Sequence, residues 1–187
     1  MNAETLLLTT LLLPLAGAAG IIITRHTPDV REGVTLLTST LIVVLAVMIA
    51  ARFMDGEMFA FTLMEPLPGI AIAFEIEALG MLFALVAGLL WVVTSIYSIG
   101  YMRGHNEQNQ TRFFAAFAVS IAATMGIAFA ANLFTLFLFY ELLTLATYPL
   151  VTHAGSPEAK RGGRTYLGIL LGTSIGLLLL GILVTWS

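Results

Sequence analysis

Polar side chains at helical spacing interrupt one long apolar stretch of this chain. Glu141 is followed at i+3 and i+7 by Thr144 and Tyr148, which places the three on one face of a helix. An ionised carboxylate inside lipid is costly, so it must take up a proton or face a cation or water. Glu141 is therefore our candidate catalytic residue, with the role of a proton relay.

The same acid has a simpler structural alternative, which is a neutral glutamic acid hydrogen-bonded to a neighbouring helix. A stripe of hydroxyl groups can join helices as readily as it can hold a short water chain. Pro149 extends this supporting polar stripe, because it cannot donate to the carbonyl of Leu145 and leaves that acceptor free. The position inside the membrane favours the functional interpretation.

Two further titratable residues are weaker candidates for a relay or a mouth of the same path. His153 follows Glu141 near the end of the same helix, and histidine can relay protons near neutral pH. Glu77 precedes another apolar run, where an acid also stabilises a helix N-terminus. We expect helix capping rather than proton uptake for Glu77, and simple solvation is the alternative for His153.

Cofactor chemistry has little support in the composition. The chain contains no cysteine and three scattered histidines, so we expect no metal site and no cofactor. It also lacks a Ser/His/Asp arrangement and a phosphate-binding glycine loop. The chain is therefore not expected to be a catalyst alone, and nothing in it indicates a nucleic-acid partner.

The elements that position these residues are transmembrane helices. Of the 187 residues, 59% are hydrophobic and 10% are charged, whereas a soluble domain carries roughly 25% charged residues. A bilayer core needs about 20 apolar residues in a helix. We predict an all-α integral membrane protein, a single transmembrane domain over 1–187, with six helices at about 5–24, 33–53, 77–102, 113–130, 133–151 and 165–186. The fourth and fifth come from one overlong run that Ala131-Asn132 divides.

The segment between the second and third helices has a different period. Ile70, Ile72 and Phe74 alternate with smaller or acidic residues, and the stretch 66–69 has the composition of a turn. This pattern predicts a β-hairpin on the outer side over about 57–76. An irregular loop with an interfacial stretch is the alternative.

Basic residues predict the orientation. Seven of the eight fall beside three alternate connections, and only Arg52 falls on the other side; the seven are Arg25, Arg31, Arg103, Arg112, Lys160, Arg161 and Arg164. The positive-inside rule places those three connections in the cytoplasm. We therefore expect a multi-pass protein with both termini on the outer side of the membrane.

Small and aromatic residues suggest packing roles. The last helix carries a ridge of glycines at every fourth position, namely Gly168, Gly172 and Gly176. Such a ridge lets another backbone approach closely, and we expect packing within the chain rather than a subunit interface. Trp91, Tyr97 and Tyr101 are expected at a membrane interface.

Several motifs resemble a known family. They are Phe113-Phe114, Asn132-Leu133-Phe134, Phe139-Tyr140-Glu141-Leu142 with Thr147-Tyr148, and the segment 158–167. They resemble the fourth and fifth helices and the start of the sixth in the antiporter-like subunits. These subunits are shared by complex I, membrane-bound hydrogenases and Mrp-type Na+/H+ antiporters, and the Mrp and hydrogenase types are the most similar.

The resemblance implies a function. Glu141 matches the glutamate of the fifth helix in that family, which pairs with a lysine on the seventh helix and drives proton movement along a polar axis. The chain is then expected to be a subunit of a multi-subunit cation/proton antiporter or proton-pumping complex in a bacterial or archaeal cell membrane, contributing half of a proton path. A structural or docking subunit without its own ion path is the alternative.

The resemblance also implies partners. Family members continue beyond six helices, whereas this sequence stops at Ser187. Either the chain is a naturally short subunit or it is a fragment. We expect other membrane subunits as partners, including one that supplies the later helices and the lysine, with protons and Na+ as the transported ions.

Overall fold

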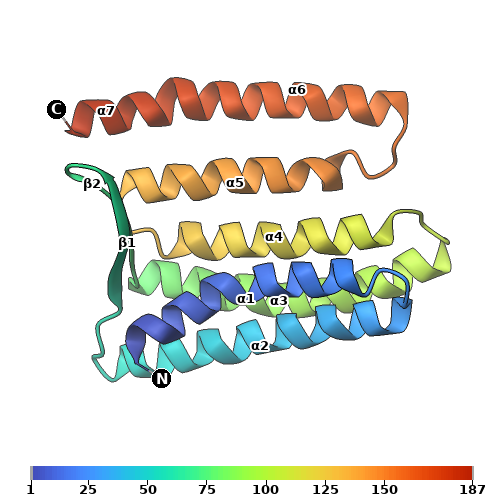
Figure 1. The fold of residues 1–187 in the computed structure, drawn as a ribbon, viewed down its shortest axis with the longest axis horizontal. Helices are drawn as coiled ribbons and strands as arrows, with labels where there is room; N and C mark the ends of the chain where they lie inside the picture. The colour runs from blue at the N-terminus through green and yellow to red at the C-terminus, as the bar shows by residue number, and fades with distance from the viewer. Residues whose placement is uncertain (1, 187) are drawn as a thin grey trace.

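The structure is a computed structural model that describes residues 2–186, and it consists mainly of long apolar helices (Figure 1). Within the described residues, six helices are long and apolar enough to cross a membrane, the last of them in consecutive segments. They are α1 (Ala3–Ile23), α2 (Pro28–Met54), α3 (Ala78–Gly104), α4 (Gln110–Ala128), α5 (Leu133–Val151), and α6 (Pro157–Thr173) with the π-helix η1 (Ser174–Leu179) and α7 (Leu180–Trp186). The predicted class of an all-α membrane protein with six transmembrane helices is confirmed.

Two helices begin earlier than the sequence indicated. Pro28 opens α2, so Arg31 lies inside this helix instead of in the preceding connection. Pro157 opens α6, and the Ser156 hydroxyl accepts a hydrogen bond from the Ala159 N–H at 3.1 Å. A serine cap followed by proline at the first helical position is a common helix start. The first turns of both helices are polar, which is why hydropathy alone placed their beginnings too late.

The predicted hairpin is present, which excludes the irregular loop. Strands β1 (Ala60–Leu67) and β2 (Ile70–Glu75) are antiparallel, and the paired rings of Phe61 and Phe74 stack with centroids 5.4 Å apart. Gly69 has a φ of +80°, which glycine adopts without strain, and its N–H donates to Glu65 Oε1 at 2.5 Å. Figure 1 shows the hairpin lying across one end of the helices.

Strand β2 is hydrogen-bonded to the connection between α4 and α5. The Glu75 N–H donates to the Phe129 carbonyl at 2.8 Å, and the Ala131 N–H donates to the Ala73 carbonyl at 3.0 Å. The Asn132 side-chain amide donates to the Ala71 carbonyl at 2.9 Å. The hairpin therefore fixes the end of α4 and the start of α5 with backbone bonds.

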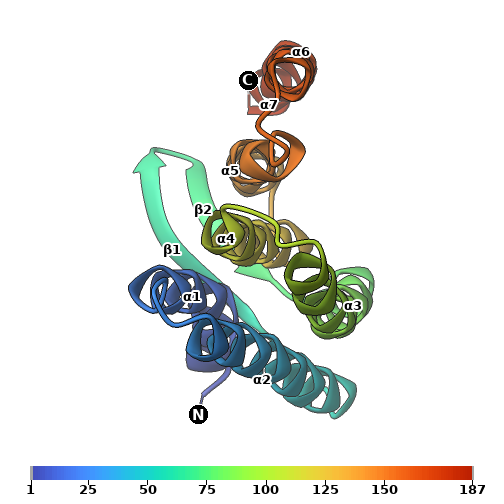
Figure 2. The ribbon, with the colours of Figure 1, turned by 90° about the vertical axis from the view of Figure 1, so that its right-hand side faces the viewer.

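Helices α1 to α4 enclose the core, and α5 and α6 extend from it in a row (Figure 2). Fully buried side chains in the core include Leu6, Ile42, Trp91 and Phe114. Trp91 is only 1% exposed and its ring packs edge-on against Phe117, so the expectation that it lies at the membrane interface is wrong. Helix α6 contacts α5 and is the most exposed of the long helices.

The ends of the bundle differ in charge. The termini of the described chain and the hairpin lie at one end, and the α1–α2, α3–α4 and α5–α6 connections lie at the other (Figure 1). Seven of the eight basic residues are on or beside those three connections. This segregation is the one that the positive-inside rule requires. The outer placement of the termini remains a prediction from that rule.

The glycine ridge of the last helix faces open space. A Cβ added at Gly168, Gly172 or Gly176 would meet no described atom of another element within 4 Å. The expected packing of this ridge within the chain is therefore wrong for the part of the protein that the structure describes. The face is available to lipid or to another subunit.

Candidate functional site

Helix α5 carries the candidate site, and its start is fixed by two polar side chains. Asn132 caps the helix, because its side-chain oxygen accepts a hydrogen bond from the Thr135 N–H at 2.8 Å. The buried Thr135 hydroxyl in turn accepts a hydrogen bond from the Ala73 N–H of β2 at 3.0 Å. From there the helix runs to Val151 and continues through Pro149.

Opposite faces of α5 contact two different helices. The Phe139 ring lies against Gly126 of α4, so close that a Cβ at Gly126 would stand 2.1 Å from the ring. On the other side the Tyr148 ring and Thr152 lie against Gly163 of α6. In both cases the glycine makes room for a bulky neighbour. Helix α5 is thereby held between α4 and α6 (Figure 2).

Glu141 lies near the middle of α5 with one carboxylate oxygen, Oε1, shielded from solvent. No described residue donates a hydrogen bond to that oxygen, and none of the described cations forms an ion pair with Glu141. Helical periodicity gives Glu141 nearly the same angular position as Tyr148 and sets it roughly opposite Phe139. The acid therefore belongs to the face of α5 that is turned to α6.

The seam between α5 and α6 is rich in hydroxyl groups. Thr144 is 3% exposed, and the Thr147 hydroxyl is 3.0 Å from the Tyr166 hydroxyl of α6. Because the helices are antiparallel and Tyr148 contacts Gly163, Glu141 is roughly level with the last turn of α6. The π-helix η1 begins there, and π-helical segments occur often at functional sites.

The structure does not bring His153 or Glu77 to Glu141. His153 follows the end of α5, about 18 Å along the helix from Glu141, and its ring packs edge-on against Phe113. Both ring nitrogens are buried without a hydrogen-bond partner among the described residues. Glu77 lies at the opposite end of the bundle, exposed, at the N-cap of α3. Its side chain makes no cap hydrogen bond.

Metal-ligating side chains are not grouped in the described part of the chain. No set of three or more histidine, aspartate or glutamate residues among residues 2–186 could hold a metal ion. The chemistry of the α5–α6 seam is therefore that of a carboxyl group and hydroxyls. Such groups can accept, hold and release protons, or coordinate water.

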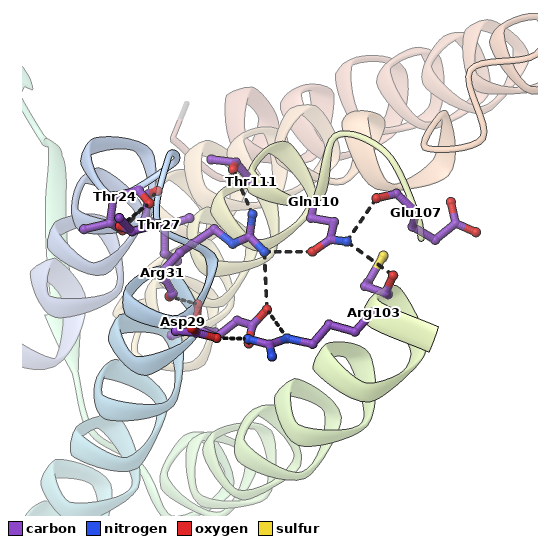
Figure 3. A network of polar contacts seen from close by, with 12 residues as sticks. Thr24, Thr27, Asp29, Arg31, Arg103, Glu107, Gln110 and Thr111 are labelled. Atoms are coloured by element: carbon purple, nitrogen blue, oxygen red, sulfur yellow. Dashed lines mark hydrogen bonds and ion pairs between the residues drawn. The ribbon is translucent and has the colours of Figure 1, made fainter. Parts of the chain in front are cut away.

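A charge cluster at the end of α3 was missed by sequence reasoning (Figure 3). It consists of Asp29, Arg31, Glu32, Arg103 and Gln110. Arg103 donates to the two carboxylate oxygens of Glu32, from Nε at 3.1 Å and from Nη2 at 2.5 Å, and also bonds to Asp29. Arg31 donates to Gln110 Oε1 at 2.7 Å and lies 3.4 Å from Glu32 Oε1. Arg31 and Glu32 are 4% and 5% exposed, so the cluster joins α2, α3 and α4 inside the protein.

The sequence indicated only an orientation role for Arg31 and Arg103, because the partners within the cluster are far apart in the chain. Glu32 and Arg103 are separated by 71 positions. One local feature could have drawn attention to them, namely the alternating charges of Asp29, Arg31 and Glu32. A loop that only sets membrane orientation does not need acids between its basic residues.

Comparison with known proteins shows which proteins the chain resembles. The family described as NADH-Ubiquinone oxidoreductase (complex I), chain 5 N-terminus, matches residues 68–114. These residues cover the hairpin turn, β2, α3 and the start of α4. The match therefore lies mostly before the fourth and fifth helices, whose motifs first indicated the relationship.

The relatives of the chain are named either as antiporter subunits or as subunits of NADH-quinone oxidoreductase. A protein of Rhizobium meliloti named as a probable K(+)/H(+) antiporter subunit is 27% identical over 96% of this chain and 33% of its own length. An NADH-quinone oxidoreductase subunit of Desulforudis audaxviator is 28% identical over 75% of this chain and 28% of its own length. A protein of Staphylococcus haemolyticus named as an antiporter subunit is 25% identical over 43% of this chain and 10% of its own length.

Together these similarities confirm the resemblance. The chain is an integral membrane protein similar to antiporter subunits and to membrane subunits of NADH-quinone oxidoreductase. It spans about a third or less of the length of these relatives.

Proposed function

We propose that this chain contributes half of a proton path to a multi-subunit cation/proton antiporter or proton-pumping complex, with Glu141 as the proton relay. The observation that carries the proposal is the position of the acid. Glu141 is near the middle of a membrane-spanning helix, and its buried Oε1 has no donor among the described residues.

A buried acceptor without a partner has a free-energy cost of about 1–3 kcal/mol, and more when it is charged. A proton, a water molecule or a cation removes that cost. A proton makes the group neutral, whereas a nearby ammonium group favours the carboxylate. A cation that approaches and withdraws would then make Glu141 release and take up a proton in turn.

The cation in this scheme comes from another part of the assembly. The basic residues of this chain lie in the connections or in the first or last turns of its helices, and those nearest along the chain, Lys160 and Arg161, are in the first two turns of α6. A lysine from a later helix or another subunit would complete the pair in the middle of the membrane. Two relatives are named as antiporter subunits, one of them for K(+)/H(+) exchange. Their names support exchange of protons for a monovalent cation, Na+ or K+.

A structural docking role is the second candidate, and one observation favours it. The glycine ridge on α6 and η1 is open, so another helix could approach the backbone closely there. Under this alternative Glu141 is a neutral hydrogen-bonding acid that transfers no proton. Both candidates require partner subunits, but only the first requires proton transfer.

Substitution of Glu141 separates the candidates. We expect Glu141→Gln to preserve assembly, since the side chain keeps its size and its hydrogen-bonding oxygen, and to reduce cation-dependent proton flux at least tenfold. The flux is measured with a pH-sensitive dye in membrane vesicles that contain the whole complex. Glu75→Gln is the control, because Glu75 is exposed at the end of β2.

The outcomes are distinct. Proton flux that persists in the Glu141→Gln complex while assembly is normal rejects the relay and leaves the docking role. Loss of flux in both variants shows that the loss does not depend on the buried acid. Recovery of part of the flux by Glu141→Asp would support proton transfer, because that variant restores a titratable group.

A further inference from the structure

A pocket of about 620 Å³ lies between the end of α1 and the first half of α4, away from Glu141. Its polar part consists of side chains at the helix ends, including Arg25, His26 and Arg112. Its apolar part includes Ile22, Ala116 and Val119, which lie farther along the helices. Nothing in the proposed proton path uses this pocket.

No carboxylate among the described lining residues balances the positive charge of this pocket. Two arginines and one histidine line it. Arg25 donates to the His26 ring at 2.9 Å, and Arg112 donates to the His153 carbonyl at 3.3 Å. Among the described residues, neither arginine forms an ion pair with an acid, in contrast to Arg31 and Arg103 of the charge cluster.

Hydrogen-bonding groups also support the polar part. Thr111 lines the pocket, and its hydroxyl accepts a hydrogen bond from Arg31 at 3.2 Å, which fixes its position in the wall. The start of α4 is also here, and the N-terminus of a long helix favours anions. All these groups favour a phosphate.

The apolar part distinguishes a lipid from a soluble anion. Val119 is nine residues into α4, about 14 Å along the helix axis from its first residue. The lining therefore changes from cationic at the membrane surface to apolar at the depth of the acyl chains. Ile22 is 53% exposed beside this groove and offers a surface for a hydrocarbon chain.

We propose that this pocket binds one anionic phospholipid, with its phosphate between Arg25, His26 and Arg112 and an acyl chain along Ile22, Ala116 and Val119. Basic pockets between transmembrane helices suit such headgroups. The pocket lies at the end of the bundle where the basic residues gather, so the lipid belongs to the leaflet on that side. This proposal is independent of the proton path.

Native mass spectrometry of the purified protein in a mild detergent tests the proposal. Phosphatidylglycerol and phosphatidylcholine with identical acyl chains are added separately. We expect one tightly bound phosphatidylglycerol and at least tenfold weaker binding of phosphatidylcholine. Arg25→Gln with Arg112→Gln should weaken phosphatidylglycerol about thirtyfold, as expected for two cations near the headgroup.

A matched control removes the same charge elsewhere. Arg161 and Arg164 lie in a second basic pocket formed by the first turns of α6, without an apolar wall from a second helix. Arg161→Gln with Arg164→Gln should change binding less than twofold. Because Arg112 also bonds to His153, Ala116→Phe serves as a second variant that fills the acyl part without altering charge.

Each result decides the proposal. Equal binding of the two lipids, an equal loss in the Arg161 and Arg164 control, or unchanged binding in Ala116→Phe overturns it. Displacement of phosphatidylglycerol by an equal concentration of inorganic phosphate would assign the pocket to soluble anions and would also overturn it. Loss confined to the pocket variants supports it.

Discussion

Arg103, in the last turn of α3, holds the two carboxylate oxygens of Glu32, in the first turns of α2. Glu32 also lies beside the buried Arg31, so it is the acid between two guanidinium groups. Its removal would leave Arg31 buried with one partner fewer. The charge cluster is therefore a structural joint of α2, α3 and α4.

We predict that Glu32→Ala destabilises the protein by about 3 kcal/mol, because it breaks a buried pair by deleting one partner. The measurement is thermal unfolding in detergent, followed by tryptophan fluorescence. Glu57→Ala is the control, since the Arg52–Glu57 contact is 3.7 Å long and both side chains are about a third exposed or more. The control should change stability by less than about 1 kcal/mol. Equal losses of stability in Glu32→Ala and Glu57→Ala would show that the charge cluster stabilises the protein no more than an exposed ion pair does.

Contact between Gly126 and Phe139 predicts a steric effect in the α4–α5 interface. In Gly126→Ala the new methyl group would lie 2.1 Å from the ring, so the helices must separate. We expect a loss of about 1–3 kcal/mol, as for other overpacked cores. Gly100→Ala in α3 is the control, because a Cβ there meets nothing within 4 Å. Partial rescue in Gly126→Ala with Phe139→Leu would identify the ring as the cause.

Neighbouring glycines in α6 make a second matched pair. A Cβ at Gly163 would stand 2.3 Å from Thr152 Cγ2 and 3.0 Å from the Tyr148 ring, whereas a Cβ at Gly162 would have open space. Gly163→Ala should cost about 1–3 kcal/mol, and Gly162→Ala should be neutral or stabilising by up to about 1 kcal/mol. Thermal unfolding of the two variants compares them directly. A similar loss in both would contradict the close approach of α5 and α6.

Asn132 has two roles that different substitutions separate. Asn132→Ala removes both the cap of α5 and the bond to the Ala71 carbonyl, for which we expect a loss of about 2 kcal/mol. Asn132→Ser keeps a capping oxygen but is too short for the second bond, so it should lose about half as much. Asn2→Ala removes a comparable cap without a link to the hairpin.

Limited proteolysis distinguishes these effects. Asn132→Ala should make the hairpin more susceptible to cleavage, whereas Asn2→Ala should leave its cleavage unchanged. If Asn132→Ser and Asn132→Ala are equally unstable, the bond to Ala71 alone determines the effect. If cleavage of the hairpin does not change, the side chain of Asn132 does not hold it.

The sequence predicts the elements of this fold better than their contacts. Long apolar runs indicate the helices, and the alternation around Ile72 indicates the hairpin, because both depend on local periodicity. The partners of Arg103 and the burial of Trp91 depend on which helix faces which, and this is decided by contacts between distant residues. The open glycine ridge could not be predicted for the same reason.

For the candidate site too, the sequence predicts what is local and does not predict contacts between distant residues. The depth of Glu141 is local information, since it depends only on the length of the helix around it. Its missing donor is not local, because any neighbouring helix could have supplied one. Gly163 and Tyr166, which line the seam with α5, were interpreted from sequence only as part of a family motif. Their contacts with Tyr148 and Thr147 are visible only in three dimensions.

Backbone bonds between β2 and residues 129–131 have a mechanical consequence for α5. A movement of this helix along its own axis would stretch both of those bonds together. Its other end, beyond Pro149, has no strand attached to it in the described structure. Helix α5 is thus fixed by backbone hydrogen bonds at the hairpin end, whereas side-chain contacts with Gly163 of α6 and Arg112 of α4 hold the end where Tyr148 meets α6.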